Sequence, residues 1–268
     1  KELYSPYQRL KHNIANSIVN RILQNSCRII AISEHTKKDI IKYFAIPNEK
    51  IRVVPLAAER RFFQKWTTSD ILRIRSRFGL PENFLLYVGG IDPRKNVRLI
   101  FKALKLLLEE NPTKCPLLAF AGDIAHQREY QQLMKSLQTL GIEDRIKFLG
   151  YIPNEELPLL YQASTMFIYP SRYEGFGLPV LQAMAARTPV ITTKLSSIPE
   201  VAGDAALYID PDNPVELARA IKEILSNHDL RLSLINSGMK RAAAFSWERT
   251  VHETIDVYRE ALLLHKKE

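Results

Sequence analysis

From residue 84 onward the chain alternates short apolar runs with amphipathic stretches of helical period. The apolar runs are rich in β-branched and aromatic residues, as is typical of buried strands. We expect strands at Phe84–Gly89, Leu117–Ala121, Ile146–Leu149, Met166–Tyr169, Val190–Thr192 and Leu207–Ile209. The helical patterns are Val97–Glu109, Gln127–Leu140, Leu178–Ala186, Val215–Leu225 and Leu230–Ala244. Strands separated by helices predict an α/β fold with a doubly wound, parallel, Rossmann-like sheet.

The first 56 residues carry a smaller pattern of the same kind. Helices are expected over Pro6–Gln24, with an apolar stripe of Leu10, Ile14, Ile18 and Ile22, and from an N-cap at Ser33 to about Tyr43. Strands are expected at Arg28–Ile32 and Ile51–Val54. Two strands are too few for a doubly wound sheet, so we interpret residues 1–56 as the end of a partial second α/β domain. Because the first residue is Lys1, we also expect translation to begin upstream.

These patterns divide the chain into four parts. Residues 57–68 are expected to form a linker, residues 69–245 the complete Rossmann-like domain, and residues 246–268 a C-terminal segment with a helix from about Trp247 to His265. The 268 residues are 46% hydrophobic and 25% charged, as in soluble globular proteins. No apolar run approaches the roughly 18 residues that a membrane span requires.

Cysteine content and charge restrict the setting of the protein. Cys27 and Cys115 are too few for a disulfide scaffold and lie at no metal-ligand spacing, so we expect a reducing compartment, the cytoplasm. The net charge is +9, and residues 1–80 hold 16 basic and 6 acidic side chains against 22 and 23 in residues 81–268. Such a basic segment can face phosphate or anionic lipid, which leaves peripheral contact with the inner face of a membrane open. It lacks the basic-plus-aromatic spacing of nucleic-acid readers, so we expect no nucleic acid.

The loop after the first strand of the main domain has the composition of an anion site. Gly89 and Gly90 allow a ligand to approach the backbone closely, and Arg94 and Lys95 precede a helix that Asn96 is expected to cap. Glycine amides, cations and a helix N-terminus together suit a phosphate group. The alternative is a tight turn with solvated cations. The loop matches neither the dinucleotide-binding nor the P-loop pattern.

The loop after the fourth strand supports the anion site. Glu174 precedes Gly175 and Gly177, and a helix opens at Leu178-Pro179 with proline in its first turn. The positive end of this helix would face the same crevice as Arg94 and Lys95. A purely structural turn would need only the glycines. The longer motif from Glu174 to Pro179 therefore favours a binding site over a structural turn.

At these residues the chain resembles the retaining nucleotide-sugar glycosyltransferases of the GT-B fold, family-4 type. The resemblance covers nearly all of residues 25–262 and is strongest in Tyr87–Asn96, Phe120–Asp123, Phe148–Tyr161, Met166–Ala183 and Ile198–Asp210. In that family two Rossmann-like domains flank a cleft, the C-terminal one binding the sugar donor and the N-terminal one most of the acceptor. The resemblance implies that residues 69–245 are the donor domain and residues 1–56 the end of the acceptor domain. It also implies that the C-terminal helix, within residues 246–268, crosses back to the acceptor domain.

The resemblance also assigns roles to individual residues. It implies that Glu174 contacts the donor hexose and that Lys95 neutralises the diphosphate. The remaining donor contacts that it implies involve two segments, the loop Gly175, Phe176, Gly177 and Leu178 near the sugar and diphosphate, and Tyr151 and Ile152 near the nucleobase. No cofactor or metal is expected, since the nucleoside diphosphate sugar is a substrate.

Two positions depart from the family pattern. Gln182 stands where the family usually has a second glutamate that binds the ribose, and Gly90 stands where many members have an arginine. We expect weaker donor binding from the first change. We hypothesise that Arg94 supplies the positive charge that is missing because Gly90 stands in place of the arginine.

The Asp210-Pro211-Asp212 sequence spells a metal-binding motif of another glycosyltransferase fold, but its context favours a turn. Asn213, Pro214 and Glu216 read as an N-cap, a first-turn proline and a capping glutamate. We therefore expect no metal there.

The expected function is transfer of a hexose with retention, with GDP-mannose slightly favoured because Pro93–Asn96 is similar to the loop of bacterial mannosyltransferase-like members. The acceptor, a glycan, a lipid-linked sugar or a small molecule, is not identified by the sequence. Two alternatives remain open: a non-catalytic nucleotide-sugar-binding module, and the donor subunit of a two-chain enzyme.

Overall fold

The computed structural model describes the backbone of residues 6–265 and the side chains of residues 16–264. The chain forms two compact units, one made of residues 1–55 and 248–268 and the other of residues 56–247. Each unit has its own buried apolar residues and its own parallel sheet. The predicted assignment of residues 1–56 and 69–245 to an acceptor side and a donor side stays a prediction.

The larger unit is built on six parallel strands. They are β3 (Phe84–Val88), β4 (Leu117–Ala121), β5 (Ile146–Gly150), β6 (Met166–Tyr169), β7 (Val190–Thr193) and β8 (Leu207–Ile209). Their order across the sheet is β5-β4-β3-β6-β7-β8. All six expected strands are present, with ends that differ by at most one residue, and the α/β, doubly wound fold class is confirmed.

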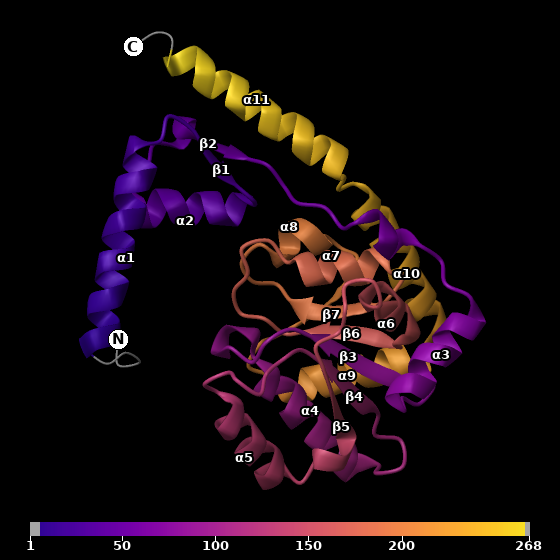
Figure 1. The fold of residues 1–268 in the computed structure, drawn as a ribbon. Helices are drawn as coiled ribbons and strands as arrows, with labels where there is room; N and C mark the ends of the chain where they lie inside the picture. The colour runs from indigo at the N-terminus through magenta and orange to yellow at the C-terminus, as the bar shows by residue number, and fades with distance from the viewer. Residues whose placement is uncertain (1–5, 266–268) are drawn as a thin grey trace. The chain divides into compact units, whose positions relative to one another are not determined.

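Helices cover both faces of this sheet. They are α3 (Thr68–Phe78), α4 (Val97–Glu110), α5 (Tyr130–Leu140), α6 (Leu157–Ala163), α7 (Leu178–Ala185), α8 (Ile198–Ala202), α9 (Pro214–Ser226) and α10 (His228–Ala243). Figure 1 shows α4, α5 and α9 on one face and α6, α7 and α8 on the other. Short 3₁₀ turns lie at Arg60–Phe63, Pro93–Lys95 and Glu143–Arg145. Three of these helices, α3, α6 and α8, are not predicted by the sequence patterns. For two of them the reason is clear, because α6 is buried on nearly all sides and α8 is little more than one turn.

A row of aromatic rings crosses the sheet from its edge strand β5 to β6, near the carboxyl ends of the strands. Tyr87 on β3 pairs with Phe120 on β4, which pairs with Phe148 on β5, and the ring centroids lie 4.7 and 5.3 Å apart. On the other side of Tyr87, the ring of Tyr169 on β6 lies at 6.1 Å. Tyr87 and Tyr169 are both fully buried, so their rings belong to the core.

Two expected helix starts differ in the structure. Asn96 precedes α4 in a left-handed conformation and makes no side-chain cap, because its amide instead donates to the Pro211 carbonyl at 2.8 Å. The helix expected from Gln127 begins at Tyr130, because the Gln127 side chain binds the backbone at Ile91 and Asp123. Both side chains form long-range contacts that local sequence patterns do not contain.

The smaller unit contains α1 (Pro6–Asn25), β1 (Ile29–Ala31), α2 (Glu34–Phe44), a 3₁₀ turn at Asn48–Lys50, β2 (Ile51–Val53) and most of α11 (Trp247–His265). β1 and β2 pair in parallel. The core of this unit consists of Ile29, Ala31, Ile46 and Ile51. The Ser33 side chain accepts a hydrogen bond from Thr36 N at 3.0 Å, which confirms the predicted cap of α2.

The apolar stripe expected on α1 is not buried where its side chains are described. Ile18 and Ile22 are 56% and 60% exposed, while Leu10 and Ile14 lie outside the described side chains. Since helical periodicity shows which residues share a face but not what that face meets, the sequence could not decide this point.

Ion pairs attach α11 to the strands of the smaller unit. Arg28, just before β1, and Arg52 on β2 both bind the Glu260 carboxylate at 2.8 Å. Hydrogen bonds from Arg28 and Arg52 hold the pKa of Glu260 below its usual value. In the part of the chain that the structure describes, no helix is both long and apolar enough to cross a membrane.

Candidate functional site

The strand order of the larger sheet reverses between β3 and β6. The chain runs from β3 outward to β4 and β5 on one side, and from β6 outward to β7 and β8 on the other. The loops that leave the carboxyl ends of β3 and β6 therefore diverge, and in doubly wound sheets ligands bind where such loops part. The two loops chosen from the sequence are these two.

The loop after β3 is held by its backbone. The Tyr87 hydroxyl donates to the Gly90 carbonyl at 2.6 Å, and Ile91 N donates to Gln127 Oε1 at 2.8 Å. A Cβ atom at Gly90 would lie 2.9 Å from Gln127 Oε1, so a larger residue would displace the Gln127 side chain. This contact gives a physical reason for glycine at position 90. The glycine-rich turn after β3 is thus built into the structure and is not a free surface loop.

Lys95 and Glu174 meet across the crevice. Lys95 ends the 3₁₀ turn Pro93–Lys95, which begins with Asp92 as its cap, and its ammonium lies 2.8 Å from Glu174 Oε1. The two side chains are only 19% and 12% exposed. They lie 79 positions apart in the sequence, so the fold alone brings this cation and this carboxylate together.

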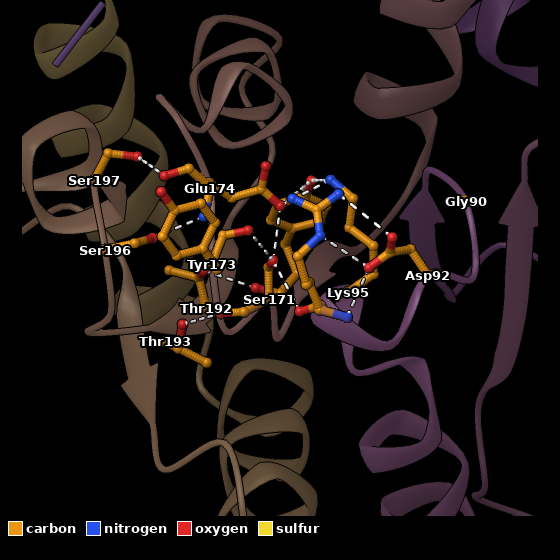
Figure 2. Close-up of polar contacts among 12 residues, drawn as sticks. Gly90, Asp92, Lys95, Ser171, Tyr173, Glu174, Thr192, Thr193, Ser196 and Ser197 are labelled. Carbon is orange, nitrogen blue, oxygen red and sulfur yellow. Dashed lines mark hydrogen bonds and ion pairs between the residues drawn. The ribbon is translucent and has the colours of Figure 1, made fainter. Parts of the chain in front are cut away.

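Glu174 is fixed by both its side chain and its backbone (Figure 2). Its Oε1 atom also accepts hydrogen bonds from the Tyr169 hydroxyl at 2.8 Å and from Ser171 Oγ at 2.7 Å. Its backbone N–H donates to Ser196 Oγ and its carbonyl accepts from Ser197 Oγ, both at 2.9 Å. Glu174 is therefore a preorganised carboxylate and not a solvated one.

The loop beyond Glu174 leads into α7 as expected. Gly177 has a φ of +102°, a conformation that residues with side chains rarely adopt, and Pro179 lies in the first turn of the helix. The ring of Phe176 is buried and packs edge-on against Phe245, with the two ring centroids 5.8 Å apart. Gly175 precedes Phe176 in the chain, and Leu178 follows Gly177. The positive end of α7 consequently lies in the same loop as Glu174.

The other predicted site residues lie at the same edge of the sheet but do not join this cluster. The Arg94 guanidinium bonds Asp92 Oδ1 at 3.0 Å rather than Glu174, and the Arg94 carbonyl accepts a hydrogen bond from Arg172 N at 2.7 Å. Tyr151 follows β5 and is 71% exposed, while its neighbour Ile152 is buried. Gln182 lies half-buried on α7, and Gly89 is the first residue after β3.

Burial and the nearby carboxylate together set the protonation state of the tyrosines. Desolvation, with the charge of Glu174 added to it, raises the pKa of Tyr169 far above its usual value, and the same two causes raise that of Tyr87. Both phenols therefore keep their protons at any physiological pH. Tyr169 can accept from Lys95, at 2.6 Å, while it donates to Glu174.

The Asp210–Asp212 turn serves as a structural tie. Asp212 forms an ion pair with Arg172, Asp210 Oδ1 accepts from Asp212 N, and the Pro211 carbonyl accepts from Arg172 and Asn96. The expected cap of α9 is present, since the Asn213 side chain accepts from Glu216 N at 3.1 Å. Across the described residues, no group of three or more His, Cys, Asp or Glu side chains could hold a metal ion.

The sequence patterns predict no site role for several residues of the cluster. They place Tyr169 in a strand, Ser171 in a loop and Gln127 at the start of a helix, and they assign nothing to Ser196 and Ser197. A signal was available for Tyr169 and Ser171, since they flank the carboxyl end of β6, where side chains of doubly wound sheets reach the crevice. For Ser196, Ser197 and Gln127 no local pattern existed, because each supports a residue of another loop.

Comparisons with known proteins show the family of the chain. The family model described as Glycosyl transferases group 1 matches residues 69–241, and the model described as Glycosyltransferase Family 4 matches residues 1–59. The O-antigen chain mannosyltransferase B of Escherichia coli is 31% identical over 259 residues, covering 96% of this chain and 66% of that protein. The serotype-specific mannosyltransferase WbdA of Escherichia coli is 26% identical over 242 residues, covering 89% of this chain and 29% of that protein.

Solved structures are similar over nearly the whole chain. The sucrose-phosphate synthase of Thermosynechococcus elongatus has a TM-score of 0.80 at 26% identity, over 94% of this chain and 62% of that one. Anabaena HepE in complex with UDP-glucose has a TM-score of 0.78 at 21% identity, over 92% of this chain and 66% of that one, which is evidence of fold alone. The chain thus spans about two thirds or less of each of these four proteins.

The Lys95–Glu174 pair generates a stability prediction. Lys95→Met should lower the free energy of unfolding by about 1–3 kcal/mol, because it leaves a largely buried carboxylate without its cation. Both tryptophans, Trp66 and Trp247, lie in the larger unit, so urea unfolding followed by tryptophan fluorescence measures the effect.

Lys222→Met is the matched control, because Lys222 pairs with Glu110 at 49% and 59% exposure and its loss should cost less than about 0.5 kcal/mol. Adding Glu174→Gln to Lys95→Met should recover part of the loss, since the unpaired charge disappears. Equal costs for the two lysine variants would contradict a special role of the Lys95–Glu174 pair in stability.

Proposed function

Because the chain belongs to the glycosyl transferases group 1 family, we propose that it is the donor-binding part of a glycosyltransferase that takes a hexose from a nucleoside diphosphate sugar. The observation that carries the proposal is the preorganised Lys95–Glu174 pair between the loops after β3 and β6. A cation and a carboxylate side by side suit a ligand with a diphosphate at one end and sugar hydroxyls at the other.

The proposed chemistry is electrostatic. When the bond between the anomeric carbon and the diphosphate breaks, negative charge grows on the phosphate oxygens. The Lys95 ammonium and the positive end of α7 stabilise that charge, and such preorganised groups typically contribute several kcal/mol to catalysis. On this proposal no metal is required, because the protein supplies the positive charge itself.

Glu174 orients the hexose, and the reaction retains the anomeric configuration. In this proposal the acceptor oxygen forms its bond to the anomeric carbon on the face that the diphosphate leaves. The acceptor proton passes to the departing phosphate oxygen, so the step balances without a protein base. The arrangement of Glu174, with an oxygen held by three donors, suits a positioning role better than a proton-accepting one.

GDP-mannose is the slightly favoured donor. The two curated relatives reported above are mannosyltransferases by name. UDP-glucose is the competing choice, since HepE is described in complex with it, but that likeness is evidence of fold alone at 21% identity. A sequence relative at 31% identity is the better guide to the donor.

Two other functions keep the same site without its full activity. The chain could act as a non-catalytic nucleotide-sugar-binding module, or as the donor subunit of a two-chain enzyme. Both would bind the donor through Lys95 and Glu174. They differ from the first proposal in turnover by this chain, which the experiments below separate.

Donor binding tests the proposal directly. Calorimetric titration with GDP, GDP-mannose, UDP and UDP-glucose should detect binding of at least one pair at millimolar concentration or below, unchanged by EDTA. Lys95→Ala should weaken diphosphate binding roughly tenfold or more, because a charge-assisted contact is lost. Arg94→Ala should have a smaller effect, since its guanidinium is bonded to Asp92.

Lys102→Ala, an exposed lysine of α4, serves as the control and should bind like the unmodified chain. No binding of any of the four nucleotides would refute the proposed function. Unchanged affinity in Lys95→Ala would remove Lys95 from the diphosphate site.

Turnover tests the reaction. Incubation of the chain with GDP-mannose should release mannose to water slowly, and proton NMR at early times should show the anomer present in the donor. The inverted anomer would contradict retention. Binding without any turnover would instead support the binding module or the two-chain enzyme.

A peripheral membrane contact is a separate proposal for the smaller unit. Helix α1 contains no acidic residue, and three of its apolar side chains, Ile18, Val19 and Ile22, are exposed. A basic helix with exposed apolar side chains is suited to an anionic lipid surface.

Vesicle sedimentation tests this contact. The chain should sediment with phosphatidylglycerol-containing vesicles and not with pure phosphatidylcholine, and Ile18→Asp with Ile22→Asp should abolish the binding. Leu72→Asp, which changes an equally exposed leucine of α3, is the control. Equal sedimentation of the α1 variant and the control would contradict a contact through α1.

A further inference from the structure

The hydrogen bonds of Glu174 are unevenly shared between its two carboxylate oxygens. Lys95 Nζ, the Tyr169 hydroxyl and Ser171 Oγ all donate to Oε1, at 2.8, 2.8 and 2.7 Å. Among the residues that the structure describes, none hydrogen-bonds to Oε2. Figure 2 shows this second oxygen pointing away from Lys95 and Ser171. One oxygen is therefore saturated by protein and the other remains for a ligand.

The hydrogen-bond donors of Lys95 are also only partly used by the protein. Its ammonium carries three N–H donors, of which one binds the Tyr169 oxygen at 2.6 Å and one binds Glu174 Oε1. The third is left without a partner in the described part of the chain. The cluster thus presents one free donor and one free acceptor, each held in place by the same neighbours.

Tyr169 connects the two halves of the cluster. Its hydroxyl accepts from Lys95 and donates to Glu174, so a single atom fixes the distance between the cation and the carboxylate. Its ring stacks on Phe167 at 5.5 Å and lies 6.1 Å from Tyr87, and its carbonyl accepts a hydrogen bond from Thr192 Oγ1 at 2.7 Å. The hydroxyl is therefore attached to the rigid core of the sheet and not to a loop.

We propose that Tyr169 is a positioning residue which, together with Ser171, saturates Oε1 of Glu174 so that Oε2 is presented to the hexose hydroxyls and the third N–H of Lys95 to the diphosphate. This inference rests on the proposed function and adds to it how Glu174 and Lys95 are oriented toward the ligand. Without the Tyr169 hydroxyl, Lys95 and Glu174 keep their direct contact but lose the shared atom that fixes their orientation. Recognition of the sugar should then suffer more than recognition of the nucleotide.

The experiment compares Tyr169→Phe with Tyr161→Phe. Tyr161 is a good control because its ring is also buried, lies 5.1 Å from Phe167, and carries a hydroxyl with no hydrogen-bond partner among the described residues. For each variant, calorimetry gives the Kd for GDP and for GDP-mannose, or for UDP and UDP-glucose if the unmodified chain prefers uridine. Thermal unfolding shows that both variants are folded.

Tyr169→Phe should weaken binding of the nucleotide sugar roughly tenfold and that of the free nucleoside diphosphate only about two- to threefold, because two hydrogen bonds to charged groups are lost near the sugar. Tyr161→Phe should change both constants by less than about twofold. Ser171→Ala provides a second route if Tyr169→Phe does not fold. Its serine is fully buried and donates to the same Oε1, so it should also affect the nucleotide sugar more.

A double variant separates positioning from a packing effect. In a Glu174→Gln background, Tyr169→Phe should cause little further loss of sugar binding, whereas a packing defect would add its full cost. If the unmodified chain binds the nucleotide sugar but Tyr169→Phe and Ser171→Ala leave its affinity relative to the free diphosphate unchanged, the inference is wrong and the proposed function stands. If the unmodified chain binds no nucleotide at all, both are wrong.

Discussion

The reversal of strand order between β3 and β6 is the constraint on which this structure depends. In doubly wound sheets covered by helices on both faces, ligands bind where neighbouring loops diverge at the carboxyl ends of the strands. That place brings together Lys95 and Glu174, two residues far apart in the chain. The proposed donor site rests on residues at this one position of the fold.

The site is also continuous with the hydrophobic core. The rings of Tyr87 and Tyr169 are buried in the sheet, yet their hydroxyls bind the loops above it, one at the Gly90 carbonyl and one at Glu174. Because close-packed interiors deform little, groups attached to them keep their geometry better than groups on loops alone. The loops that carry the proposed site are in this way attached to the buried core of the sheet.

Backbone ties complete this arrangement in the loops themselves. Ser196 and Ser197 hold the backbone of Glu174, and Gln127 holds that of Ile91. The Asp210–Asp212 turn binds Arg172 and Asn96 and so joins three loops at the edge of the crevice. Polar residues that resemble catalytic or metal-binding groups in the sequence thus act mainly as supports, and the groups left for a ligand are few.

By itself the sequence determined the six strands, the doubly wound class and the glycine-rich loop after β3, and it predicted a site at Lys95 and Glu174. It could do so because periodicity, turn residues and short motifs depend on neighbours within a few positions. Only the tertiary structure decided that Asn96 binds Pro211 instead of capping α4, that Arg94 pairs with Asp92, and that Tyr169 and Ser171 share one oxygen of Glu174. Hydrogen bonds between loops depend on distances that no local pattern encodes. These contacts could therefore be identified only from the positions of the strands in the tertiary structure.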